Sequence, residues 1–62
     1  MYGVIAKTGS QTFIFCLTDS EQRARSLYQT YKFRSIKSTV IGIAKLSEDS
    51  RIGDNFNGVI TA

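Results

Sequence analysis

The chain of 62 residues has no histidine, no proline, no tryptophan and a single cysteine, Cys16. A disulfide needs two cysteines and a structural zinc site usually needs four Cys or His ligands, so both kinds of staple are excluded. We therefore expect stability to come from packing or from oligomerisation. Cys16 lies in the apolar run from Phe13 to Leu17, which predicts a small buried side chain. A lone free thiol also indicates a reducing, cytoplasmic location.

Long hydrophobic runs are missing as well. The longest uninterrupted run, Phe13 to Leu17, is far shorter than the roughly 20 residues of a membrane span. The first residues lack the basic and apolar regions of a signal peptide. With 42% hydrophobic and 21% charged residues, the composition is that of an ordinary folded protein. We expect a soluble single domain over residues 1–62, with no membrane partner, encoded by a complete small reading frame.

The sequence also lacks the usual equipment of an enzyme. Without histidine, general acid–base chemistry would depend on carboxylates or on Cys16, and no candidate base lies near Cys16. Asp19 and Glu21 are explained by a helix start, and the other three carboxylates fall in a polar loop. No phosphate-binding glycine pattern or EF-hand spacing is present. We predict no enzymatic activity, no cofactor and no metal.

What the sequence does contain is a clear hairpin signal. Residues 2–8 and 11–17 are rich in β-branched and aromatic types and predict two strands. Gly9 and Ser10 between them favour a type II′ turn, because glycine tolerates a positive φ at the first position. This turn pairs Thr8 with Gln11, and by counting outwards it pairs Ala6 with Phe13, Ile5 with Ile14, Val4 with Phe15 and Tyr2 with Leu17.

Side-chain alternation divides the hairpin into two faces. The face with the larger side chains is expected to face the core and contains Tyr2, Val4, Ala6, Phe13, Phe15 and Leu17. The opposite face contains Gly3, Ile5, Lys7, Thr12, Ile14 and Cys16. Phe13 and Phe15 could instead stack RNA bases, but the basic-Gly-aromatic triplet of an RNA-binding sheet does not precede them.

A helix is predicted over residues 19–32. Thr18 followed by Glu21 has the spacing of a capping box, with Thr18 as the N-cap. Ala24, Leu27, Tyr28 and Tyr31 follow the i, i+3, i+4, i+7 spacing of one helical face. We expect this stripe to pack on the aromatic face of the hairpin.

Residues 38–46 predict a third strand, with its side chains again on two faces. Residues 47–57 are polar and turn-rich, with Ile52 or Phe56 as an anchor to the core, and residues 59–61 predict a short last strand. The fold class is therefore α+β, a small ββαβ(β) domain in which one helix packs on one face of a mainly antiparallel sheet. Alternation places Val40, Gly42, Ala44 and Leu46 on one face of the third strand and Thr39, Ile41, Ile43 and Lys45 on the other.

The face of the sheet without the helix is the first candidate site. A solvated face of an antiparallel sheet usually carries polar residues, whereas isoleucines within a polar rim predict an exposed contact patch. Two arrangements would bury this patch instead. The third strand could be flipped so that Ile41 and Ile43 face the core, or residues 52–60 could fold back over the face. The predicted partner-binding residues are Ile5, Ile14, Ile41 and Ile43, rimmed by Lys7 and Lys45.

The second candidate site is basic. The net charge is +3, and five of the eight basic residues fall between positions 23 and 37. Such a cluster is typical of a phosphate-binding surface. At 100° per residue the basic side chains occupy two flanks of the helix and leave a neutral outer face, which favours cations that only cover the core edge. The residues are Arg23, Arg25, Lys32, Arg34 and Lys37.

Three functions follow from these sites. The first is a non-enzymatic module that binds a protein through a sheet face or edge and acts as an accessory regulator or inhibitor, of the kind found in phages and mobile elements. The second is a basic nucleic-acid-binding protein that uses the helix-region cluster. The third is a subunit of a homo-oligomer.

Overall fold

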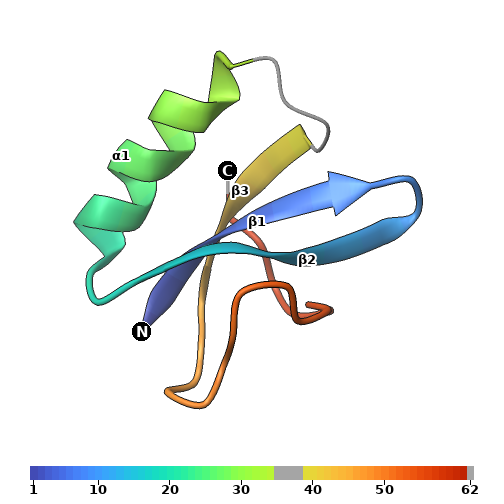
Figure 1. The fold of residues 1–62 in the computed structure, drawn as a ribbon. Helices are drawn as coiled ribbons and strands as arrows, with labels where there is room; N and C mark the ends of the chain where they lie inside the picture. The colour runs from blue at the N-terminus through green and yellow to red at the C-terminus, as the bar shows by residue number, and fades with distance from the viewer. Residues whose placement is uncertain (35–38, 62) are drawn as a thin grey trace.

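The computed structural model describes residues 1–34 and 39–61. Within these ranges the elements follow in the order β1 (Tyr2–Thr8), β2 (Gln11–Thr18), α1 (Glu21–Lys32) and β3 (Thr39–Lys45) (Figure 1). The strands form one antiparallel sheet in the order β2-β1-β3, so β1 is the central strand. The helix α1 packs on one face of this sheet, which confirms the predicted α+β class.

The hairpin turn is as predicted. Gly9 has a φ of +62°, and no described residue other than glycine has a positive φ, so Ser10 does not. This combination is that of a type II′ turn. The register next to the turn, from Thr8 opposite Gln11 to Ile5 opposite Ile14, is also confirmed.

Beyond Ile14 the predicted register is wrong by one residue. The pairing shifts between Val4 and Ile5, so Val4 lies opposite Cys16, and Phe15 is the extra residue of a β-bulge. Phe15 and Cys16 both pack on the α1 side of the sheet, and Leu17 packs on the other side. The bulge therefore exchanges the predicted faces of Cys16 and Leu17.

A second bulge lies on the other side of β1. There Ile5 pairs with Gly42 and Ala6 pairs with Val40, which leaves Ile41 as the extra residue of β3. Strict alternation breaks at this point. The predicted division of this strand is therefore wrong, because Val40 and Ile43 share the α1 side whereas Ile41, Ala44 and Leu46 face away from α1.

The helix begins two residues later than predicted. Its N-cap is Ser20, whose backbone is extended and whose Oγ accepts a hydrogen bond from the Arg23 N–H at 3.1 Å. Thr18 is the last residue of β2, and its hydroxyl donates to Asp19 at 3.5 Å. The capping box predicted from Thr18 and Glu21 is therefore wrong, because the strand continues through Thr18.

Replacing Ser20 by alanine is expected to cost about 1 kcal/mol of unfolding free energy, because the Arg23 N–H loses its acceptor. For a domain of this size, that loss corresponds to a fall in Tm of roughly 4–8 °C. Thermal unfolding followed by circular dichroism measures it, and Thr18→Ala is the matched control with a smaller expected fall. A larger fall for Thr18→Ala would contradict this position of the cap.

The predicted apolar stripe of α1 is confirmed. Ala24 is fully buried, and Leu27, Tyr28 and Tyr31 pack against the sheet. The Phe15 and Tyr31 rings meet edge to face, with centroids 4.9 Å apart. The buried residues of this first core are Val4, Ala6, Ala24, Val40 and Ile43.

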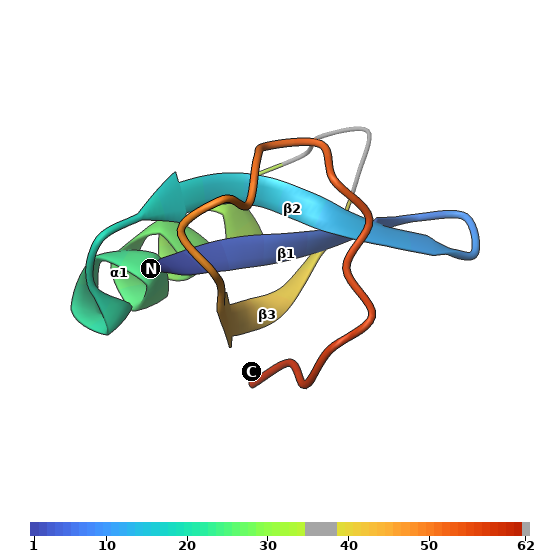
Figure 2. The same ribbon diagram turned by 90° about the horizontal axis from the view of Figure 1, so that it is seen from below.

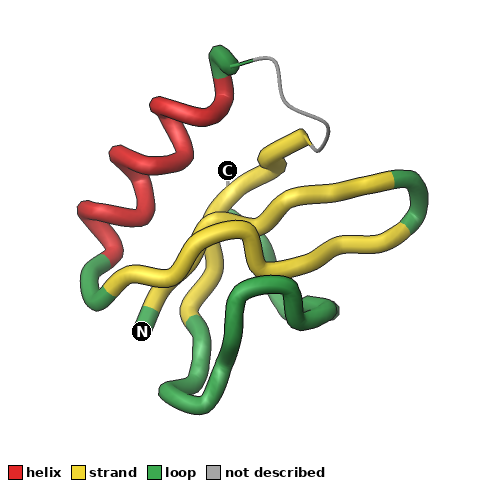
Figure 3. Tube along the Cα trace, in the orientation of Figure 1, coloured by secondary structure: helices red, strands yellow, loops and turns green. Residues whose placement is uncertain are grey.

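The opposite face of the sheet is covered by the end of the chain. After β3 the chain returns across this face as the loop trace seen in Figures 2 and 3. Phe56 and Ile60 from this segment pack on a second core of buried residues. We call residues 53–61 the C-terminal strap. The buried residues beneath it are Ile5, Ile14, Ala44 and Leu46.

The C-terminal strap is hydrogen-bonded to the outer edge of β2. The Ile14 N–H donates to the Asp54 carbonyl at 2.9 Å, and the Gly53 N–H donates to the Ile14 carbonyl at 2.8 Å. The Phe56 N–H donates to the Thr12 carbonyl at 3.0 Å, and the Thr12 hydroxyl donates back to the Phe56 carbonyl.

The end of the strap reaches the other edge of the sheet. Ile43 and Thr61 exchange two backbone hydrogen bonds of 2.7 and 2.8 Å. The strand predicted at 59–61 is thus a single bridge between Thr61 and Ile43 in the described part of the chain. The strap holds both edge strands, which covers backbone groups that would otherwise offer a template for another strand.

Candidate functional site

The isoleucine patch predicted on the sheet is not an exposed surface. Ile5 and Ile14 are 0% and 2% exposed beneath the strap. Ile41 lies half-buried beside them, and Ile43 is buried on the α1 side. The prediction of an open contact patch is therefore wrong. The arrangement found is the alternative in which the segment 52–60 folds back, with Phe56 as its anchor and Ile52 left 66% exposed.

The two lysines predicted at the rim of this patch are exposed but far apart in the sheet. Lys7 pairs with Thr39 near one end of β1, and Lys45 pairs with Tyr2 at the other end. They do not form one binding surface with the isoleucines.

The helix-region basic residues are exposed in the structure. Arg23, Arg25, Lys32 and Arg34 all have exposed side chains, and Lys37 lies outside the described residues. Arg25 forms an i,i+4 ion pair with Glu21 at 3.3 Å, with both side chains about half exposed. Such a surface pair is worth at most about 1 kcal/mol, so Arg25 can exchange it for another anion.

The last turn of α1 combines exposed cations with aromatic rings. The Lys32 Nζ lies 5.7 Å from the Tyr28 ring centroid and 5.9 Å from that of Phe33. The Arg34 Cζ lies 5.8 Å from the Tyr31 ring centroid. These distances are within the cation–π range, which at exposed sites stabilises by about 0.5–1 kcal/mol. We call Tyr28, Tyr31, Lys32, Phe33 and Arg34 the basic–aromatic end of α1.

Phe33 is the exposed ring of this end. It is the C-cap of α1 and is 81% exposed, whereas Tyr28 and Tyr31 lie half-buried against the sheet. The Arg34 N–H donates to the Tyr31 carbonyl at 3.1 Å, which fixes the backbone on either side of Phe33. The ring therefore projects from an anchored turn.

Acidic residues are concentrated away from this end. Asp19 and Glu21 lie at the start of α1, which with its 12 residues is about 18 Å long. That distance exceeds the screening length of about 8 Å at physiological salt. The other carboxylates follow β3 in the loop and strap, across the molecule from the end of α1 (Figure 1). The basic–aromatic end is thus locally cationic.

The cations of this end are predictable from the sequence, but the exposed ring of Phe33 was not predicted. The helical stripe ends at Tyr31, and Phe33 does not continue its spacing. The signal available was the alternation of aromatic and basic residues in Tyr31, Lys32, Phe33 and Arg34. An aromatic residue outside the apolar stripe and between two cations is an exposed ring unless another element covers it.

Among the residues that the structure describes, two ionisable groups have shifted pKa values. Burial raises the pKa of the half-buried Cys16 thiol, which disfavours the nucleophilic thiolate. The Ser47 hydroxyl donates a hydrogen bond to the Asp49 carboxylate at 2.6 Å. This bond, and a second one from the backbone N–H of Asp49, lower the pKa of the Asp49 carboxyl. The Asp49 interactions are local and order the turn after β3.

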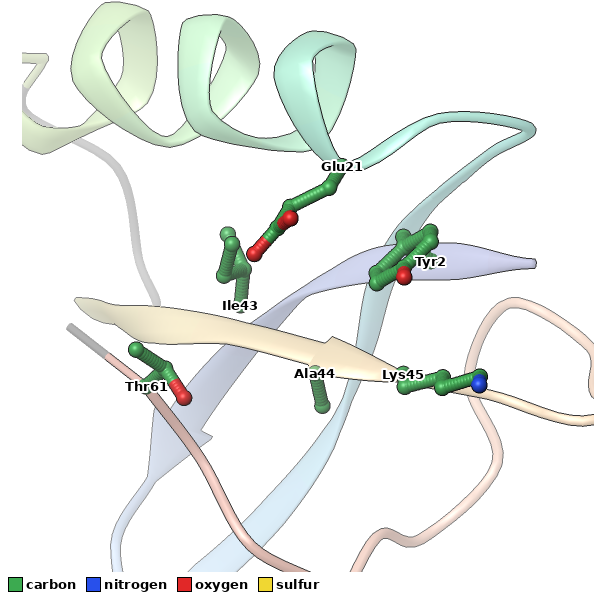
Figure 4. A pocket seen from close by; sticks show the side chains of 6 residues that line it. All are labelled: Tyr2, Glu21, Ile43, Ala44, Lys45 and Thr61. Atoms are coloured by element: carbon green, nitrogen blue, oxygen red, sulfur yellow. The ribbon is translucent and has the colours of Figure 1, made fainter.

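A shallow pocket of about 140 Å³ lies between the first turn of α1 and β3 (Figure 4). Glu21 points from the helix towards Ile43, and Lys45 extends away along the strand. Pockets for organic ligands usually measure about 300–1,000 Å³, so this one is too small for such a ligand. Its lining residues are Tyr2, Glu21, Ile43, Ala44, Lys45 and Thr61.

Comparison of the chain with protein-family models, with curated proteins and with solved structures finds no match. Within residues 1–34 and 39–61, no three His, Cys, Asp or Glu side chains gather as metal ligands would. None of the described helical structure is long and apolar enough to span a membrane.

Proposed function

We propose that this protein is a non-enzymatic nucleic-acid-binding module whose contact surface is the basic–aromatic end of α1. The observation that carries the proposal is Phe33, 81% exposed between two cations whose charged groups lie over aromatic rings. Phosphates bind cations regardless of sequence, and aromatic rings stack on bases. A cationic surface with a projecting ring can contact both the phosphates and the bases of a nucleic acid.

The covered sheet face also supports this proposal. Binding a partner through Ile5 and Ile14 would first require the strap to leave, because both side chains are buried under it. The basic–aromatic end needs no such rearrangement. Unlike the covered sheet face, it can bind while the described fold stays intact.

A test of this proposal neutralises the two cations that flank Phe33. In the double variant Lys32→Gln/Arg34→Gln, affinity for a fluorescein-labelled oligonucleotide of about 16 nucleotides is expected to fall, as measured by anisotropy. The dependence of log K on log salt should also become shallower by roughly 1.4–1.8, because each lost phosphate contact removes about 0.7–0.9. The wild type is expected to bind in the micromolar range and to weaken steeply with salt.

The matched control is Lys45→Gln/Arg51→Gln, which lowers the net charge from +3 by the same two charges at exposed positions outside α1. This control should retain the affinity of the wild type within roughly twofold. Equal losses in both double variants would show a general charge effect and contradict a site at the end of α1. Absence of any binding at low salt would refute the nucleic-acid function itself.

A regulator or inhibitor that binds a protein is the second candidate. It is favoured by two exposed aliphatic side chains, Ile52 and Val59, which are 66% and 86% exposed. Contiguous exposed apolar area marks a protein interface, and these two side chains would supply the apolar contacts of one. Affinity capture from a lysate separates the two candidates: a partner retained after nuclease treatment supports protein binding, and one lost on treatment supports nucleic acid.

A further inference from the structure

The surface around Phe33 is more selective than a patch of charge. Lys32 and Arg34 alone would bind any phosphate backbone, whether single- or double-stranded. Phe33 adds a flat apolar surface that is 81% exposed and lies outside both cores. At this exposure Phe33 contributes little to the packing of the fold, and its ring is accessible to a ligand.

The exposed ring lies at the end of α1 and not on the outer face of the helix. Within α1, Arg23 lies on one flank of the apolar stripe and Arg25 and Lys32 lie on the other, and Arg34 follows the C-cap. The outer face between these flanks carries the exposed and neutral Gln22, Ser26 and Gln29. A helix that lies in the major groove reads base edges with side chains on its outer face. Glutamine and serine on that face can read base edges, whereas Phe33 lies beyond it at the C-cap, flanked in sequence by Lys32 and Arg34.

A single-stranded nucleic acid presents both unstacked bases and phosphates to the basic–aromatic end of α1. Its bases are free to leave their neighbours and stack on an aromatic ring, whereas in a duplex each base is already stacked and paired. The Lys32 Nζ is 5.9 Å from the Phe33 ring centroid, so a base on this ring brings its own phosphates close to a cation. Arg34, on the other side in sequence, supplies a second cation over Tyr31.

We infer that the basic–aromatic end of α1 is a single-strand-selective site, in which Phe33 stacks on one base and Lys32 and Arg34 contact the phosphates beside it. This inference rests on the nucleic-acid function proposed above and names its substrate class. The stacking contact is sequence-tolerant because every base has a π face. Affinity should therefore differ little among bases but strongly between single and double strands.

The test replaces the ring and keeps the charges. Phe33→Ala is expected to weaken binding of the single-stranded oligonucleotide by about 5- to 150-fold, the range measured for one base on one aromatic ring. Binding of the same sequence annealed as a duplex should change by no more than roughly twofold. Phe33→Trp should restore single-strand binding, and Phe33→Leu, which is apolar but has no π system, should not. The salt slope of Phe33→Ala should equal that of the wild type, because no phosphate contact is lost.

The outcomes separate this inference from the proposed function. If the wild type binds neither strand form, both fail. If it binds both forms with salt dependence and Phe33→Ala alters neither, or alters both equally, the nucleic-acid function stands and the single-strand site is refuted. Circular dichroism checks that each Phe33 variant keeps the wild-type fold, as expected for a side chain that belongs to neither core.

Discussion

Replacing Ile5 by alanine is expected to lower the free energy of unfolding by about 2–5 kcal/mol, the range for removing most of a buried isoleucine. Ile5 is 0% exposed on the central strand and belongs to the core that Phe56 and Ile60 cover. A domain of 62 residues has roughly 3–9 kcal/mol of stability in total. The variant should therefore unfold at a much lower urea concentration than the wild type, as measured by urea titration followed by circular dichroism.

The control for this prediction is Ile52→Ala. Ile52 is 66% exposed, so the same change of side chain should alter the unfolding free energy by no more than about 0.5 kcal/mol. Similar stabilities for Ile5→Ala, Ile52→Ala and the wild type would mean that the sheet face is open to solvent. In that case the contact patch predicted from the isoleucine pattern would have to be reconsidered.

The parts of the fold that depend on neighbouring residues could be predicted from the sequence. The Gly9-Ser10 turn determines the pairing of the four residue pairs next to it, because a two-residue loop leaves one register. The stripe of α1 was predicted for the same reason, since its spacing is a local property. The four pairs next to the turn and the four residues of the stripe were both confirmed.

The errors begin at the bulges. An extra residue at Phe15 or Ile41 leaves the strand composition unchanged but reverses the faces of the residues that follow. The stretch around Phe15 does not distinguish a bulge from regular alternation, because it is β-branched, aromatic or apolar throughout, whereas Gly42 beside Ile41 is a strand glycine of the kind that often marks a bulge. The faces of Cys16 and Leu17 therefore depended on tertiary packing.

The helix start shows a different limit. Thr18 and Ser20 are both good N-cap residues, and only Thr18 has a glutamate three positions later. Thr18 is not the N-cap because it pairs with Tyr2 as the last residue of β2. A local capping preference of about 1 kcal/mol thus loses to a longer strand.

The charged residues of the candidate site were predictable from the sequence, but the exposure of its aromatic ring was not. The cluster between positions 23 and 37 is visible in the sequence, and the exposure of its described members follows from their place beside the stripe. The exposure of Phe33 required knowing that no other element among residues 1–34 and 39–61 covers the end of α1. The burial of Ile5 likewise required knowing where the C-terminal strap lies.

The C-terminal strap determines which surfaces are available for binding. It joins the β2 edge at Asp54 and the β3 edge at Thr61, and its apolar side chains cover the face between them. With the strap in place, the sheet face is a core rather than an interface. Binding is then left to the exposed side chains of α1 and the loops.

Gly42 is the position at which this placement of the strap can be tested most directly. A β-carbon at residue 42 would lie 2.6 Å from the Ile60 Cγ2 and 2.6 Å from the Thr61 carbonyl oxygen. One of these contacts is to backbone, so a rotamer change cannot relieve it. Gly42→Ala is therefore expected to force the end of the strap away from β3 and to destabilise the fold by roughly 1–3 kcal/mol, as for other overpacked sites. The gain of about 0.5–1 kcal/mol from removing a strand glycine does not offset this clash.

Amide hydrogen exchange shows whether the effect is local to the strap. The Ile43 and Thr61 amides should lose protection in Gly42→Ala, because their two mutual hydrogen bonds break. Amides of the β1–β2 pairing should lose no more protection than the global destabilisation of roughly 1–3 kcal/mol accounts for. In a double-mutant cycle, adding Ile60→Ala should relieve part of the Gly42→Ala cost, because it removes the Ile60 Cγ2 that the new methyl meets. Additive costs with unchanged protection at Thr61 would mean that the strap does not lie on Gly42.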